Sequence, residues 1–343
     1  MNITFLIGNG FDLGFGINTS YSSFLDYYLQ IDTSDTDIKI FKERIKNARN
    51  YEVDNKWADC EIAKGEDTRN YDEGVMFLKC WGDFFSELLG YLKAECDRID
   101  EDGYADYCAE LKRSLIGFDQ ALTPKDGDIV RNNPRYYKQE NIIFSFISFN
   151  YTDCLDKCVD KLGNTTLKEW YSGGTRRAYI STVVHPHGCM TGGNYIFGVN
   201  DASQVANQAL LEDADIEIDI IKHSGNSSCK NYQEDEAIEI IKQSDLIFIY
   251  GMSLGKTDKL WWARIGNWLC ASADYLLIIQ QHKSITMQSP IWAQVSSERE
   301  TKKLFFSLTD LSDEEIEAVQ TQVIVTFQPA IFRFEQHKEK YVR

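Results

Sequence analysis

The sequence has little that would divide it into parts or place it in a membrane. Only 5 of its 343 residues are Pro, and there is no Pro-rich or Gly/Ser-rich stretch, so no linker is visible and we expect a single domain over residues 1–343. No apolar run approaches the ~20 residues that a membrane-spanning helix needs, so we expect no membrane partner. The chain is 43% hydrophobic with 19 Phe, which is enough to form a core and excludes global disorder.

A basic stripe is also missing. The formal net charge is -17, from 36 Lys and Arg against 53 Asp and Glu. Proteins that hold nucleic acid through its phosphates need clustered Lys and Arg, and only Lys39–Lys46 is locally basic. Direct binding of nucleic acid is therefore not expected. The acidic composition still permits a metal-dependent nuclease, because the site of such an enzyme is itself acidic.

The nine cysteines lack the spacing of a disulfide framework or of a metal site. Their odd number and the lack of a secretory segment favour a reducing environment, so we expect a cytoplasmic protein. Cys154 and Cys158 are four residues apart and would share one face of a helix, but no second Cys or His pair stands at ligand spacing. Packed thiols are the better interpretation, and no metal is predicted.

The hydrophobic pattern changes along the chain from one strand, through helices, to repeated strands. Residues 2–7 form a short apolar run closed by Gly-Asn-Gly, and residues 20–132 have mostly helical periodicity. From residue 142, short β-branched and aromatic runs are mostly separated by helical or loop stretches: IIFSFISF, RAYISTVV, NYIFGV, DLIFIY and YLLIIQ.

This pattern predicts an α/β fold with a mostly parallel, Rossmann-like sheet that is covered on both faces. A large helical insertion would follow the first strand, at about residues 20–140. A C-terminal extension at about residues 284–343 would hold a helix at Ser312–Val319 and a last strand at Gln322–Phe327.

The first candidate site is I-G-N-G-F-D, directly after the first expected strand. Gly8 and Gly10 permit positive φ and the close approach of a ligand, and free N–H groups in such a strand-to-helix turn favour phosphate. Asn9 and Asp12 complete the turn, which lacks the third glycine of the dinucleotide fingerprint. The alternative is a tight turn in which Asp12 acts as a cap or a hydrogen-bonded brace.

The second and third candidates also follow expected strands, where open α/β sheets bind ligands. In S-F-N-Y-T-D, the amide of Asn150 can hold a ribose hydroxyl or a water, although Thr152 or Asp153 could simply cap the next helix. In V-V-H-P-H-G, His185 and His187 are two of only five histidines, and a His can act as a general base or orient a substrate. No third metal ligand is apparent, and the alternative is a pair of packed loop histidines.

Two further candidates are Y-G-M-S-L-G-K-T-D and W-A-D-C-E. In the first, only three residues separate the two glycines where a phosphate loop needs four, but Gly251, Ser253 and Asp258 can still line a nucleotide. The alternative is a strand–turn–helix junction. In the second, Trp57 and Glu61 share one helical face and could be no more than an aromatic–acid pair.

Taken in order, NGFDL, FNYTD, HPHG and GMSLGKTD resemble the AbiH family of abortive-infection proteins. Trp57 with Glu61 resembles the early W–D–E signature of that family, and the similarity spans roughly Ile3 to Trp262. The family is associated with phage resistance in which the infected cell stops supporting the phage. The resemblance therefore implies an anti-phage role and an unknown phage-derived trigger.

The same ordered motifs distantly resemble sirtuins and prokaryotic sirtuin-like NAD hydrolases. That resemblance implies a sirtuin-like sheet, with Gly8 and Gly10 near the phosphates of NAD and Asn150 near the nicotinamide ribose. It also implies His187 as general base or ribose orienter. Gly251 and Ser253 would lie at the adenosine end.

Two features depart from the sirtuin-like pattern. The sirtuin-like pattern has an acid two residues after the Asn. Here that position holds Thr152, and Asp153 comes one residue later. The four-Cys zinc module of sirtuins is absent, so deacylation is not expected.

The motifs predict a pocket that binds a nucleotide. The sirtuin-like resemblance implies NAD as ligand or substrate and cleavage of its N-glycosidic bond, with Asn150 and His187 as the catalytic residues. The other predicted ligand-binding residues are Gly8, Asn9, Gly10, Asp12, Asp153, His185, Gly251, Ser253 and Asp258. Three alternatives stay open: a non-catalytic nucleotide sensor, an adaptor whose loops merely turn, and a metal-dependent nuclease that uses Glu61, Asp12 or Asp153. A homo-oligomer is equally compatible with the sequence.

Overall fold

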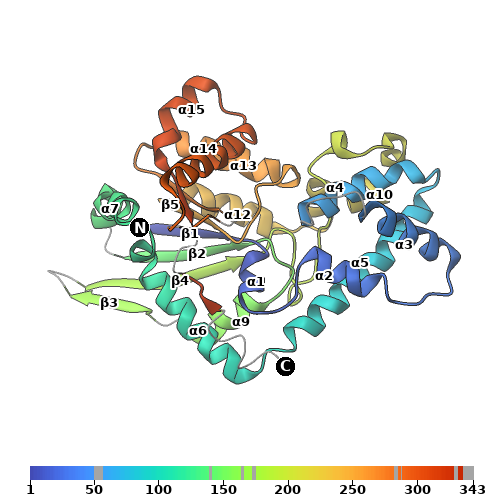
Figure 1. Ribbon diagram of the computed structural model, residues 1–343, viewed down its shortest axis with the longest axis horizontal. Coiled ribbons are helices and arrows are strands. Elements are labelled where there is room, and N and C mark those ends of the chain that lie inside the picture. The colour runs from blue at the N-terminus through green and yellow to red at the C-terminus, as the bar shows by residue number, and fades with distance from the viewer. Residues whose placement is uncertain are drawn as a thin grey trace.

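The computed structural model describes residues 1–49, 57–138, 141–163, 166–171, 175–281, 285–286, 288–327 and 331–334 (Figure 1). Within these residues the chain forms a mixed α/β fold around one seven-stranded sheet with the order β3-β4-β2-β1-β5-β6-β7. The strands are β1 (Asn2–Ile7), β2 (Ile142–Ser148), β3 (Lys168–Tyr171), β4 (Thr175–Val184), β5 (Leu246–Tyr250), β6 (Leu276–Gln281) and β7 (Val323–Phe327). β3 pairs antiparallel with β4 and every other neighbouring pair is parallel, so the expected mostly parallel sheet is confirmed.

The first strand, β1, lies at the centre of the sheet between β2 and β5. Parallel strands that are covered on both faces are apolar throughout instead of alternating, and β5 is buried at every position. Phe5 pairs with Phe146 of β2 and with Phe248 of β5, and its ring centroid lies 5.6 and 5.3 Å from theirs. These stacked rings form the middle of the core.

Helices cover both faces of the sheet: α6 (Glu101–Ile116) and α9 (Cys154–Leu162) on one face, and α12 (Tyr232–Gln243), α13 (Lys259–Cys270), α14 (Ile291–Ser307) and α15 (Asp313–Val319) on the other (Figure 1). Alternate residues of a strand point to opposite faces. Accordingly, Ile3, Phe5 and Ile7 belong to the core cluster of the first face, and Leu6 belongs to that of the second.

A second group of helices lies beyond the carboxyl ends of the strands (Figure 1). We call this group the helical lobe: α2 (Tyr21–Tyr28), α3 (Thr36–Arg49), α4 (Trp57–Asp67), α5 (Gly74–Cys96) and α10 (Ala214–Ile220). It has its own aromatic core, in which Phe84 packs against Phe24, Tyr28 and Trp81.

The remaining helices are short: α1 (Gly10–Gly14), α7 (Pro124–Asn132), α8 (Pro134–Lys138) and α11 (Lys222–Ser228). The segment at 20–132 is thus mostly helical where it is described, as its periodicity indicates. Across the ranges given above, none of the helices has the length and apolar character that crossing a membrane requires.

One expectation about a strand needs correction. NYIFGV at 194–199 is not a strand: Asn194 has a φ of 53°, and Phe197 packs against Phe84 and Phe85 of the helical lobe. The helix and the last strand expected after residue 284 correspond to α15 and β7, and β7 extends the sheet in parallel with β6.

The loops that follow β1 and β5 are in direct backbone contact. Gly8 N donates to Tyr250 O at 3.0 Å, and Gly10 N donates to Gly251 O at 2.7 Å. The expectation that these two amides are free for phosphate is therefore wrong. Positive φ is also not found at Gly8 or Gly10, whereas Gly251 has a φ of 66°. The glycines of the first turn serve to bring two loops together.

We predict that Gly10→Ala lowers the free energy of unfolding by about 1–3 kcal/mol, because overpacking costs that much. A Cβ at residue 10 would lie 2.6 Å from Gly251 Cα, which is backbone and cannot turn away. Gly82→Ala in α5 is the matched control, since a Cβ there meets nothing within 4 Å. The free energy of unfolding of the control should rise by up to about 1 kcal/mol, because Ala favours a helix more than Gly does. Equal urea midpoints for Gly10→Ala and the wild type would contradict the close contact.

Candidate functional site

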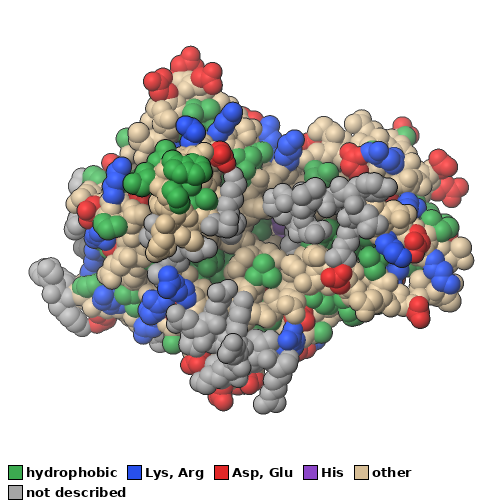
Figure 2. Space-filling view, viewed as in Figure 1, with side chains coloured by type: hydrophobic (Ala, Val, Ile, Leu, Met, Phe, Trp, Pro, Cys, Tyr) green, Lys and Arg blue, Asp and Glu red, His purple; other side chains and the backbone are tan. Residues whose placement is uncertain are grey.

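A cavity of about 310 Å³ lies at the carboxyl ends of the central strands, between the sheet and the helical lobe. The space-filling view has a recess between these two halves, in which a histidine side chain is visible (Figure 2). On the same face, basic side chains are scattered among acidic ones and form no stripe. Residues from all five sequence motifs line the cavity, and these include Gly8, Asn9, Gly10, Asp12, Glu61, Asn150, His187, Gly251, Ser253 and Asp258.

One wall of the cavity carries a buried charged cluster. Lys222 Nζ, at the start of α11, lies 2.9 Å from Glu61 Oε2 on α4 and 2.9 Å from Asp258 Oδ1 in the turn after β5. The backbone carbonyl of Thr257 also accepts from Lys222 Nζ, at 3.3 Å. The ammonium group therefore joins the helical lobe to the sheet.

The three charged groups differ in their proton affinity. Burial raises the pKa of Glu61 to about 7, although the charge of Lys222 opposes the rise. Burial also opposes ionisation of Asp258, yet Lys222 brings the pKa of this carboxyl below its ordinary value. Burial would lower the pKa of Lys222, but Asp258 and Glu61 together raise it. At neutral pH, Lys222 and Asp258 are charged and Glu61 is ready to accept or release a proton.

His187 faces the same cluster. Its Nε2 lies 3.9 Å from Asp258 Oδ1, which is too far for a hydrogen bond, and its ring meets Phe149 edge-on at 5.1 Å. Burial and the nearby Lys222 lower the pKa of His187 to about 3, so the imidazole is neutral at physiological pH. A group of such low basicity is a poor general base but can hold a hydroxyl. Of the two predicted roles, the lowered pKa of His187 is more compatible with the orienting one.

The opposite wall is built from the loops after β1 and β2. Asn150 Nδ2 donates to Gly8 O at 3.1 Å, and Thr152 Oγ1 donates to Asp12 Oδ2 at 2.6 Å. Burial raises the pKa of Asp12 to about 7, against the hydrogen bonds from Thr152 and Asn150. Asp12 is therefore a brace between the loops, as the alternative interpretation of its motif proposed, and it also reaches the cavity.

Three predicted residues are not placed at the cavity. His185 does not line it: His185 Nε2 lies 3.0 Å from Asp156 Oδ2 on α9, and its Nδ1 lies 3.2 Å from Asn150 O. Asp153 does not line it either, and its Oδ1 lies 3.0 Å from Lys157 Nζ. The prediction that these two side chains bind the ligand is therefore not supported. The side chain of Trp57 lies outside the described residues.

Sequence reasoning missed Lys222, the centre of the charged cluster. No local signal marks this residue, because its partners Glu61 and Asp258 lie 161 and 36 positions away in the chain.

We predict that Asp12→Asn removes a pH dependence of stability. A carboxyl with a folded pKa of about 7 against an ordinary 3.8 stabilises the fold fully below about pH 4, and this contribution is lost as pH rises through 7. Between pH 4 and pH 8, the free energy of unfolding of the wild type should therefore fall by on the order of 1–4 kcal/mol relative to that of Asp12→Asn. Urea unfolding of both proteins at several pH values measures the difference. Asp72→Asn, an exposed control, should show the same dependence of the free energy of unfolding on pH as the wild type. If Asp12→Asn also showed the wild-type dependence, the raised pKa of Asp12 would be contradicted.

The comparison with known families gives one match. The family "Bacteriophage abortive infection AbiH" matches residues 4–278, a span that holds every residue of the cavity. No curated protein matches the chain. Because the family match covers well over half of the chain and includes the converging motifs, the protein belongs to the AbiH family of bacteriophage abortive-infection proteins.

Proposed function

We propose that the cavity binds a nucleotide, preferably NAD, and that the protein cleaves the N-glycosidic bond of this substrate during phage infection. The observation that carries the proposal is a cavity at the junction of β1 and β5 that is lined by carboxyl groups. If the edge strand β3 is set aside, the strand order counted along the chain is 3-2-1-4-5-6. Doubly wound dinucleotide-binding sheets have this order and bind their ligands where it reverses, which here is between β1 and β5.

The side chains at the cavity suit a reaction through a positively charged ribose. Cleavage of an N-glycosidic bond develops an oxocarbenium-like centre at C1′, and a nearby carboxylate stabilises it. The ionised Asp258 supplies negative charge, and Glu61, with a pKa of about 7, suits a proton acceptor at neutral pH. Asn150 and the neutral His187 line the same cavity and would hold ribose hydroxyls or the attacking water.

In this mechanism nicotinamide leaves with the electron pair of the C1′–N bond, which neutralises its ring. Water adds to C1′ and transfers a proton to the carboxylate of Glu61. The products are nicotinamide and ADP-ribose. Loss of NAD would then deprive the phage of a metabolically active host.

A nuclease that holds a metal between Glu61 and Asp258 is disfavoured by one contact. The ammonium of Lys222 lies 2.9 Å from both carboxylates and occupies the place that a bridging cation needs. Of the other two acids considered for a nuclease, Asp12 lines the cavity but accepts a hydrogen bond from Thr152, and Asp153 does not line it.

The test is incubation of the purified protein with NAD and a panel of other nucleotides, followed by mass spectrometry of the products. We expect nicotinamide and ADP-ribose from the wild type. Glu61→Gln should reduce the rate by about 10²–10⁴, since removal of a general base has that effect, and the residual rate should lose its rise through pH 7. Glu66→Gln is the matched control on the same helix, because Glu66 is exposed.

His187→Ala and Asn150→Ala should also lose activity, with His223→Ala as an exposed control. Melting temperatures of all variants separate loss of function from loss of fold. Recovery of NAD that is bound but intact would indicate a non-catalytic nucleotide sensor instead of an enzyme. Failure of every nucleotide to bind would reject the proposed ligand class. Full phage protection by a folded Glu61→Gln protein would remove the hydrolase mechanism.

A further inference from the structure

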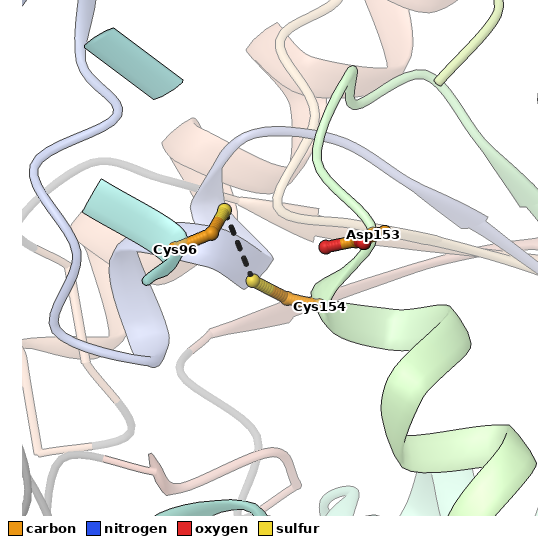
Figure 3. A group of neighbouring side chains, drawn as sticks. All are labelled: Cys96, Asp153 and Cys154. Carbon is orange, nitrogen blue, oxygen red and sulfur yellow. Dashed lines mark hydrogen bonds between the residues drawn. The ribbon is translucent and has the colours of Figure 1, made fainter. Parts of the chain in front are cut away.

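A second cluster of reactive side chains lies on the far side of the loop that follows β2. Cys96 is the last residue of α5, Asp153 precedes α9, and Cys154 is the first residue of α9. The sulfurs of Cys96 and Cys154 are 3.5 Å apart, and one oxygen of Asp153 lies within 4.8 Å of both. Figure 3 shows the three side chains directed toward a common point.

We propose that Cys96, Asp153 and Cys154 bind a zinc ion. Two thiolates and a carboxylate are ligands that zinc takes in proteins. Two sulfurs that are each about 2.3 Å from a tetrahedral zinc ion lie roughly 3.8 Å apart, so a separation of 3.5 Å needs little adjustment. A water molecule can complete the fourth position.

The carboxylate of Asp153 provides an independent observation. The residue is 8% exposed, and its Oδ1 is buried without a hydrogen-bond partner among the described residues. Lys157 Nζ lies 3.0 Å from this oxygen, which gives attraction of charge without a well-directed hydrogen bond. The ion pair offsets part of the cost of burying this charge, and the hydrogen-bonding capacity of the oxygen stays available to a cation.

The charges balance when the metal is bound. Zinc binding releases the protons of both thiols, which leaves three negative charges on the ligands. The ion and the ammonium of Lys157 supply three positive charges, so the buried assembly becomes neutral. The same bond would fix the end of α5 to the start of α9, directly after the loop that carries Asn150 and Thr152 into the cavity.

The neighbouring cysteine pair offers a matched control. Cys108 Sγ lies 3.5 Å from Cys158 O, one turn along α9, and both side chains are buried. Among the described residues, no carboxylate or imidazole joins Cys108 and Cys158 in a group of metal-ligand size. Zinc binding should therefore depend on Cys96 and Cys154 and not on Cys108 and Cys158.

The experiment measures zinc in the full-length protein, kept under a thiol-free reductant. Cys229→Ser and Cys270→Ser first remove the two exposed thiols. After chelation, addition of zinc and gel filtration, we expect about one zinc per chain by mass spectrometry. Cobalt in place of zinc should give a thiolate charge-transfer absorption band.

Asp153→Asn should weaken zinc binding by more than about tenfold and Cys96→Ser should abolish the cobalt band, whereas Cys108→Ser should leave both unchanged. Asp153→Asn keeps both thiols and so remains informative if Cys96→Ser does not fold. Absence of retained zinc in the folded protein would overturn the proposal. Retention that is equal in Asp153→Asn, Cys96→Ser and Cys108→Ser would overturn it as well.

Discussion

The ammonium group of Lys222 binds two buried carboxyl groups that come from opposite halves of the molecule. Glu61 belongs to the helical lobe and Asp258 follows the central strand β5, and each lies 2.9 Å from Lys222 Nζ. Removal of one partner from such an arrangement typically costs 3–5 kcal/mol, because an uncompensated charge stays buried. This cation therefore helps to hold the lobe over the strand ends, directly at the wall of the cavity.

The contact between the β1 and β5 loops imposes a second constraint on the cavity. Since Gly8 and Gly10 donate their N–H groups to Tyr250 and Gly251, these amides are already used within the protein. The side-chain amide of Asn9 is likewise used, because it donates to Thr19 O and accepts from Thr19 Oγ1. The charged wall opposite this turn therefore offers the stronger contacts to a ligand. This differs from a phosphate loop, in which backbone amides surround the anion.

The sequence was sufficient to predict those features of the fold that depend on the local hydrophobic pattern alone. Continuous apolar runs in β1 and β5 identified buried parallel strands, and parallel strands place their carboxyl ends together, so motifs far apart in the chain converged. Long-range contacts were not accessible in this way. His185 and His187 are two residues apart, yet only His187 reaches the cavity, because His185 is held by Asp156 on α9.

A similar limit applied to the pattern NYIFGV. Its composition is typical of a strand, but Phe197 is buried better among the aromatic rings of the helical lobe. Whether Phe197 packs in the sheet or in the core of the helical lobe depends on the tertiary structure of both, and the periodicity of the sequence carries no information about that. Lys222 was missed for the same reason, since its partners are distant in the chain.

The central place of β1 also has a consequence for synthesis on the ribosome. Ile3 is made long before its partners Phe144 and Leu246, which follow far later in the chain. At about 5–20 residues per second, roughly 12–50 s pass before β5 can pair with β1. During that interval the helical lobe can collapse on its local contacts, while β1 has at most one of its two neighbouring strands, β2. The unpaired edge of β1 is thus open to aggregation in the nascent chain and to chaperones that bind extended apolar segments.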